Sequence, residues 1–389
     1  MIFKTLLVIL LYLPFFLNGS EMQNPISKFL QTSKMHYIKT LDEGGLVHFV
    51  LGNESADLDS VVSSISYAYL LAEENKSEFY IPLMNIPRGE INLRKDILYL
   101  FELFGISLDD LLFLDDEEVR LNRLFKENRL RINLVDHNIL RHALIGFSDV
   151  VERIIDHHVG ENKFYPLIGE KNKLIAVVGS NATLIAEKIF SSSHVKCFPQ
   201  LGTFLLAPIL IDTSNLRSEK TAPRDIQAVK KLKKIASIPK GFYQKLKNAK
   251  NDVFDLTVEM LLRKDFKEYL DENIFYGISS LPYEMHLNLD NLELISEDLK
   301  NFTTMRNLDY LLVLMASYTV DMKRAILVYS ASMEYLKAFD VHVQTDEVLK
   351  NILILSDISD ANVHIYRTKK AIARKQLQPL LHLSTIKQL

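Results

Sequence analysis

Four short apolar segments of this 389-residue chain each lead to acidic or imidazole side chains. They are residues 47–51 before Asp57 and Asp59, residues 132–135 before Asp136, residues 150–155 before Asp156-His157-His158, and residues 209–211 before Asp212. Apolar runs of this length are typical of buried parallel strands, whose carboxyl ends meet in the crevice where open α/β sheets bind ligands. Carboxylate oxygens combined with imidazole nitrogens suit Mn²⁺ or Mg²⁺. The pattern therefore predicts a two-metal phosphoesterase site at one sheet edge.

The Asp57-Leu58-Asp59 triplet is ambiguous by itself. Alternate residues of an extended chain point the same way, so both carboxylates could reach one site. The competing explanation is helix capping, with Ser60 as the N-cap of the next helix. We favour the metal site because the other acidic segments accompany this one.

The arrangement of apolar segments predicts a two-domain α/β protein. Residues 28–216 alternate strands, such as 80–83, with helices at 67–73, 96–104 and 115–131, as a doubly wound parallel sheet requires. Residues 217–240 are predicted to connect this domain to a smaller α+β domain at 241–389. That domain should hold a helix at 253–269 and strands at 275–281, 311–317, 325–329 and 352–355.

Composition restricts the function further. A net charge of −3 gives no general attraction to nucleic acid, so no nucleic-acid partner is expected. Cys197 is the only cysteine, which excludes an intramolecular disulfide and a thiolate zinc site. The apolar segment within residues 1–21 is too short for a comfortable membrane span. Two interpretations stay open for it: a secretory signal peptide, or an uncleaved extension with Met22 as the true start.

Several segments resemble the signature motifs of the DHH phosphoesterases with a DHHA2 domain, closest to the exopolyphosphatase and prune branch. In the first domain they are GNESADLDS at 52–60, VDHN at 135–138, DHH at 156–158 and IDTSNL at 211–216. In the second domain they are DFK at 265–267, GISSLP at 277–282 and ARKQ at 373–376. The resemblance runs from about residue 29 to the C-terminus and implies an active site in the cleft between the domains.

The resemblance also implies the roles of individual residues. One metal would be held by Asp57 and Asp136, and the other by Asp59, Asp136, His157 and Asp212. Asn53 stands where related pyrophosphatases have histidine, so a neutral amide oxygen would replace an imidazole, and with Asp136 and His158 it is a predicted catalytic residue. His158 would contact phosphate, and His137 would orient Asp136.

The second domain would supply the positive charge that a phosphate chain requires. The resemblance implies that Lys267, Arg374 and Lys375 hold phosphates away from the metals. Ala373 departs from the usual serine, so one phosphate-contacting hydroxyl is missing there. Backbone amides near Ser180, before a helix expected at 184–190, are a further predicted phosphate contact.

The implied activity is hydrolysis of terminal phosphoanhydride bonds of polyphosphate by a hydroxide held between two divalent ions, Mn or Mg, in a cytoplasmic enzyme. The alternatives are an inorganic pyrophosphatase, a prune-like cyclic-nucleotide phosphodiesterase, and a protein-interaction scaffold with little turnover. A secretory location is the alternative that the N-terminal segment leaves open. The sequence does not specify an oligomeric state.

Overall fold

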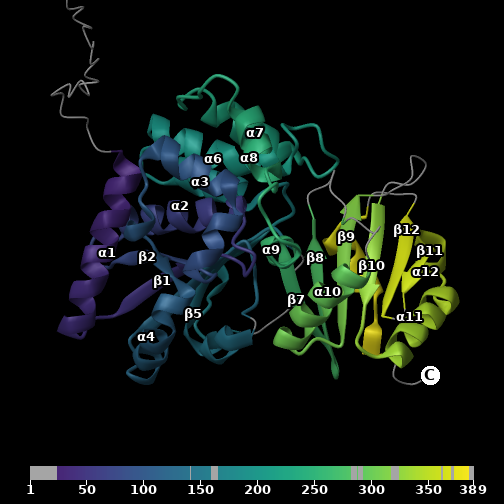
Figure 1. The fold of residues 1–389 in the computed structure, drawn as a ribbon. Coiled ribbons are helices and arrows are strands. Elements are labelled where there is room, and N and C mark those ends of the chain that lie inside the picture. The colour runs from purple at the N-terminus through teal and green to yellow at the C-terminus, as the bar shows by residue number, and fades with distance from the viewer. Residues whose placement is uncertain are drawn as a thin grey trace, which may run out of the picture.

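The computed structural model describes residues 24–140, 142–158, 165–281, 287, 292–316, 324–360, 362–368 and 372–384. These residues form two α/β bodies that lie side by side, each built around one sheet (Figure 1). The N-terminal segment 1–21, Pro282 and Ser317 lie outside the described residues. No helix in the described ranges combines the length and the apolar character needed to cross a membrane.

The first sheet has six strands in the order β3-β2-β1-β4-β5-β6, and all neighbouring strands are paired in parallel. The strands are β1 (Val47–Leu51), β2 (Tyr80–Met84), β3 (Leu112–Phe113), β4 (Leu130–Val135), β5 (Val151–Asp156) and β6 (Lys173–Ile175). Strands β1, β4 and β5 are neighbours, so their carboxyl ends share one edge. The predicted doubly wound parallel sheet is confirmed.

Helices cover both faces of this sheet. One face is packed by α4 (Leu114–Lys126) and part of α1 (Pro25–Glu43), which bury Leu121, Leu124 and Tyr37 against it. The other face is packed by α2 (Leu58–Glu74), α3 (Lys95–Phe104), α5 (Asn181–Ser191) and α6 (Pro199–Asp212). Two separate apolar cores therefore hold the strands, and the strands read as continuous apolar runs because both of their faces are buried.

One predicted element of this domain is wrong, and another is correct in type but misplaced at its start. Residues 209–211 are not a strand but the last turns of α6, which is apolar all round and fully covered by neighbouring helices. A short apolar run in such a helix has the same sequence pattern as a buried strand. The helix predicted at 67–73 begins nine residues earlier, at Leu58, and its N-cap is Asp57 instead of Ser60.

The segment predicted as a connector contributes to the first core. Its helix α7 (Pro223–Leu232) buries Ala228, Val229 and Leu232 there. The next helix, α8 (Phe242–Asn251), lies in the range predicted as the second domain, but it adds Phe242 and Leu246 to the same core. The carboxylate of Asp225 accepts hydrogen bonds from the amide of Gly179 at 2.8 Å and from the hydroxyl of Thr183 at 2.6 Å. This segment therefore packs against the first sheet's helices and ends close to the second domain (Figure 1).

The second sheet also has six strands, in the order β11-β12-β10-β9-β8-β7, with one parallel pair, β8 and β9. The strands are β7 (Phe266–Asp271), β8 (Ile274–Ser280), β9 (Tyr310–Ala316), β10 (Arg324–Tyr329), β11 (Leu353–Asp360) and β12 (Val363–Thr368). Its two faces are covered mainly by α9 (Val258–Lys264) with α10 (Leu292–Arg306), and by α11 (Met333–Thr345).

The predicted helix at 253–269 is wrong, because only α9 is helical and the chain enters β7 at Phe266. Its apolar residues at 253, 256 and 260 fit helical spacing, but the pairing of β7 with β8 outweighs that local pattern at residues 266–269. Strand β12 was not predicted. The four predicted strands of this domain correspond to β8, β9, β10 and β11.

Polar contacts join the two bodies next to the first motif. Arg263 of α9 forms an ion pair with Glu90 at 2.5 Å, and Lys264 donates a hydrogen bond to the Leu93 carbonyl. The next residue of the first domain, Arg94, is buried and donates to the carbonyls of Ser55 and Glu90, each at 2.8 Å. The loop at 53–57 is thus held by the same segment that contacts the second domain.

Candidate metal centre

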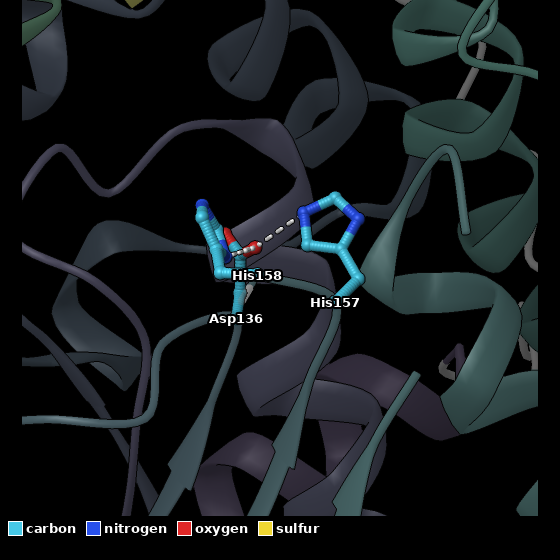
Figure 2. A group of neighbouring side chains, drawn as sticks. All are labelled: Asp136, His157 and His158. Carbon is cyan, nitrogen blue, oxygen red and sulfur yellow. Dashed lines mark ion pairs between the residues drawn. The ribbon is translucent and has the colours of Figure 1, made fainter. Parts of the chain in front are cut away.

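Asp136, His157 and His158 lie together at the carboxyl edge of the first sheet (Figure 2). The His157 Nε2 is 3.1 Å and the His158 Nδ1 is 3.9 Å from Oδ1 of Asp136. One potential ligand atom from each of the three residues lies within 4.8 Å of the others. This cluster arises because β4 and β5 are adjacent and both end at this edge.

The backbone and side chain of Asp136 are held firmly. Its φ of 61° lies in the left-handed region, and its amide donates to the Ile155 carbonyl at 3.0 Å. The second carboxylate oxygen accepts from the Asn53 amide nitrogen at 2.7 Å and from the Ser60 hydroxyl at 2.5 Å. Two side-chain donors therefore fix the carboxylate, and the amide bond to Ile155 fixes the backbone behind it.

The rings of the two histidines are oriented by acceptors behind them. His157 Nδ1 is 2.9 Å from the Val178 carbonyl, which leaves Nε2 facing Asp136. His158 Nδ1 is 2.7 Å from Asp156, whose other oxygen accepts from Asn138 at 2.5 Å. Such anchoring fixes the tautomer and aim of a metal-ligating or phosphate-contacting imidazole. Val178 and Asn138 had no sequence signal for this role.

Asp57 and Asp59 reach the edge from a helix start and not from an extended strand. Asp57 caps α2 by accepting from the Ser60 amide at 3.1 Å. Asp59, in the first turn, accepts from the amides of Asn181 and Ala182 at 2.6 and 2.9 Å. The expectation that both side chains project from extended chain is wrong, because capping geometry begins the helix at Leu58.

The bonds to Asp59 also bear on the amides predicted to bind phosphate. Helix α5 begins at Asn181 and not at Leu184, and its first two amides are satisfied by the Asp59 carboxylate. The Ser180 hydroxyl is fully buried and has no hydrogen-bond partner among the described residues. Ser180 therefore stays a predicted contact, whereas the amides are already used within the protein.

The structure reassigns two of the predicted supporting residues. His137 is bonded through Nδ1 to its own strand, to the Val135 carbonyl at 2.9 Å, and shows no hydrogen bond to Asp136 among the described contacts. Asn53 turns its amide oxygen to the Ser55 amide at 2.9 Å and its nitrogen to Asp136. In this conformation Asn53 positions Asp136 and does not offer its oxygen to the centre of the site.

The acidic side chains shift one another's pKa values. Burial raises the pKa of Asp59 well above its ordinary value, and the charges of Asp136 and Asp212 add to the effect. Burial, with Asp136, also raises the pKa of Asp57. Burial raises the pKa of Asp212 to about 6, although Lys250 opposes the shift. The fold therefore concentrates more negative charge here than its own cations neutralise.

The imidazoles divide into one charged and one neutral ring. Burial disfavours the charged form of His157, but the hydrogen bond and charge of Asp136 outweigh it and raise its pKa to about 9. Burial lowers the pKa of His158 to about 4 despite its bond to Asp156. Conversely, burial alone would raise the pKa of Asp136, but His157 and His158 lower it overall. The proton on His157 thus occupies the position where a cation would be coordinated.

These features fit divalent metal ions. The donor set contains carboxylates and imidazoles without any thiolate, as hard divalent ions require. Asp136 has contacts on both of its oxygens and Asp57, Asp59 and Asp212 act on it electrostatically. A cation bound here would replace the proton of His157 and relieve the mutual repulsion of the carboxylates.

Cations of the second domain approach the same edge. Lys375 Nζ lies 3.3 Å from His157 Nε2, across 218 residues of sequence. Arg374 is held by Asp265, with Nη2 2.6 Å from its carboxylate and Nη1 2.8 Å from its carbonyl. Burial tends to lower the pKa of Lys267, but Glu54 of the first motif, together with Tyr269 and Asp136, raises it overall. All three predicted cations therefore lie within the electrostatic reach of the acidic site.

One basic residue of the site was missed. Lys250, near the end of α8, has a raised pKa because Asp212, Asp96 and Asp57 outweigh its burial. Its surroundings in the sequence, a lysine-rich helix, resemble a solvated surface and gave no signal. Arg94 and Asp265, which hold the first motif and Arg374, were likewise not predicted.

Comparison with known proteins agrees with this geometry. The family models "DHH family, N-terminal domain" and "DHHA2 domain" match residues 48–206 and 244–383. The chain is 32% identical to a "Putative exopolyphosphatase" of Schizosaccharomyces pombe, over 87% of this chain and 91% of that protein. It is 30% identical to "Exopolyphosphatase PRUNE1" of Homo sapiens, over 88% of this chain and 76% of that protein.

A solved structure shares the fold. It is a "putative family II inorganic pyrophosphatase" of Methanococcus jannaschii, with a TM-score of 0.61 at 23% identity, covering 86% of this chain and 98% of that chain. The parallel sheet with its acidic edge, followed by the second sheet, defines a DHH phosphoesterase with a DHHA2 domain. This chain belongs to that family, in the branch of the exopolyphosphatase and prune proteins.

Proposed function

We propose that this chain is an exopolyphosphatase that removes terminal phosphates from inorganic polyphosphate with the help of two divalent ions, Mn²⁺ or Mg²⁺. The observation that carries the proposal is the 3.3 Å approach of Lys375 to His157 at the acidic edge. It brings a phosphate-binding cation of one domain against the metal-ligand cluster of the other. The named relatives support a hydrolase of phosphoanhydride bonds.

The proposed roles follow from the contacts around Asp136. Asp57, Asp59, Asp136, His157 and Asp212 would hold the ions, with Asp136 shared because both of its oxygens face different partners. When bound, divalent ions would neutralise the phosphate charge and lower the pKa of an attacking water. His158, neutral at pH 7 because of burial, can donate a hydrogen bond to a phosphoryl oxygen. Asn53 keeps the Asp136 carboxylate aimed.

The second domain would bind the phosphates beyond the scissile one. Asp265 fixes the Arg374 guanidinium, so this cation loses little freedom when a phosphate arrives. Burial lowers the pKa of Lys375. A phosphate bound beside this lysine would raise its pKa again. Lys267, Arg374 and Lys375 would together place positive charge opposite the acidic edge. A substrate with several phosphates can contact both surfaces at once, which favours polyphosphate over a simple monoester.

The test is phosphate release from polyphosphates of defined length, pyrophosphate and a cyclic nucleotide, with Mn²⁺ or Mg²⁺ added to chelator-treated protein. We expect the highest kcat/KM for polyphosphate, and we expect Asp136→Asn to retain less than about one tenth of the activity because both ions lose a ligand. Asp42→Asn, an exposed carboxylate of α1, is the matched control. Preference for pyrophosphate or the cyclic nucleotide would replace the substrate assignment. Metal-independent turnover would refute the role of the ions, and undetectable turnover would favour a scaffold.

A further inference from the structure

A second cavity lies in the first domain, on the side of α2 away from the metal centre. Its volume is about 350 Å³, within the size range of small-molecule sites. It is lined by the last turns of α2, the start of β2, the middle of β5, and residues of β6 and α5. About 20 Å of helix separates Asp59, in the first turn of α2, from Glu74 at the cavity. A ligand here would therefore not touch the metal ligands.

The charged residues of the lining are mostly cations. Three of the four, Arg153, Lys171 and Lys188, are positively charged, and Glu74 is the only carboxylate among the described lining residues. Arg153 is held by the Asn133 amide oxygen at 3.0 Å and by Glu152 at 3.2 Å. The two lysines are exposed and make no ion pair or side-chain hydrogen bond among the contacts of the described chain. The cavity therefore has positive charge available for a ligand.

The rest of the lining is apolar, with one polar group that has no partner. Leu70, Leu71, Ile155 and Leu174 contribute the apolar surface. Tyr67 is only 6% exposed as a residue and lines the cavity, and its hydroxyl makes no hydrogen bond among the described contacts. The hydroxyl is not one of the fully buried polar atoms that lack a partner, so it can donate to a molecule in the cavity. An inorganic anion alone would leave both the apolar surface and this hydroxyl unused.

We propose that this cavity is a second binding site, for a small phosphate ester whose phosphate pairs with Lys171, Lys188 and Arg153 and whose organic part covers the apolar lining. The arginine supplies planar donors suited to phosphate, and the lysines supply mobile point charges. The Tyr67 hydroxyl hydrogen-bonds the organic part. This site does not depend on the activity proposed above, because none of its side chains is a proposed metal ligand; Ile155 contacts Asp136 only through its backbone carbonyl.

Titration calorimetry of the full chain in EDTA, with adenosine monophosphate as the probe, tests the proposal. We expect saturable binding that weakens at least tenfold in Lys171→Glu/Lys188→Glu. Lys173→Glu, an exposed neighbour that does not line the cavity, should stay within about twofold of the wild type. Tyr67→Phe should weaken binding without changing the charge. Inorganic phosphate should bind at least tenfold more weakly than the ester.

Four results would overturn the proposal. The first is the absence of saturable binding, and the second is a loss of affinity in Lys173→Glu as large as that in the cavity variant. The third is a loss of affinity in Lys375→Ala with no loss in the cavity variant. The fourth is equal affinity for inorganic phosphate and the ester. The Lys375 variant locates binding at the metal edge, so it separates the two sites. The substituted lysines are exposed, and circular dichroism of each variant checks that the fold is retained.

Discussion

Replacing Asp212 with Asn should stabilise the metal-free protein. Burial raises the pKa of this carboxyl from 3.8 to about 6, with Asp57 and Asp136 adding to the effect against Lys250. The folded state therefore binds more protons than the unfolded state between these pH values, and stability falls as pH rises from about 4 to about 6. Above pH 6 the full cost of the charge is present.

The pKa shift sets the size of the effect. A shift of about two units corresponds to about 3 kcal/mol of unfavourable free energy at pH 7.5. The amide also deprives Lys250 of one of its carboxylate neighbours, so we expect a net gain of about 1 to 2 kcal/mol in the free energy of unfolding. At pH 4 the folded carboxyl is already protonated, and the gain should nearly vanish.

Urea unfolding in EDTA at pH 4 and 7.5, followed by far-UV circular dichroism, measures this gain. The chain has no tryptophan, so circular dichroism is the more direct signal. In saturating Mn²⁺ the order should reverse, because the wild type gains binding free energy that the variant loses. Asp42→Asn should show neither effect. A variant that is less stable than the wild type in EDTA, or a gain of equal size at pH 4, would refute the reasoning.

Three further substitutions test other contacts of the site. Arg94→Lys removes the guanidinium that donates to the loop at 53–57, so it should lower the free energy of unfolding by about 2 to 3 kcal/mol and weaken metal affinity. Urea unfolding and metal titration measure the two effects, and an unchanged metal affinity would contradict this role of Arg94. Arg374→Ala should lower kcat/KM for polyphosphate about ten-fold to a hundred-fold with metal affinity unchanged, whereas an equal loss toward a phosphomonoester would assign it to the fold. Gly52→Ala would place a β-carbon 2.8 Å from the Ser60 β-carbon, so it should lower the melting temperature, and an unchanged value would show that the loop relaxes.

The sequence was most informative where one local pattern had one structural solution. The apolar runs at β1, β4 and β5 correspond to strands because both faces of a parallel sheet are buried. The strand predicted at 209–211 was wrong because a helix surrounded by other helices is as apolar as a buried strand. The helix prediction at 253–269 was wrong at its end, because strand pairing in the second sheet decided the conformation of residues 266–269.

The site was predictable in its ligand types but not in its supporting contacts. Adjacent strand ends bring Asp136 and His157 together, which topology alone implies. Asp59 accepts a hydrogen bond from the start of α5, and Lys250 interacts with Asp57. Each of these interactions joins segments more than 100 residues apart. Such pairings depend on the packing angles of helices, and no local spacing records them. The family resemblance supplied the cations of the second domain, whose positions no local pattern gave.

The left-handed backbone of Asp136 limits which residues can replace it. Asparagine and glycine adopt a φ near 61° at little cost, whereas alanine or a branched residue pays about 1 to 2 kcal/mol for the backbone alone. Asp136→Asn would therefore remove the proposed metal ligand at little cost to the fold. Most other single substitutions of Asp136 would remove it at a higher cost. A descendant of this chain that abandoned catalysis while keeping its fold would be expected to carry Asn or Gly at this position.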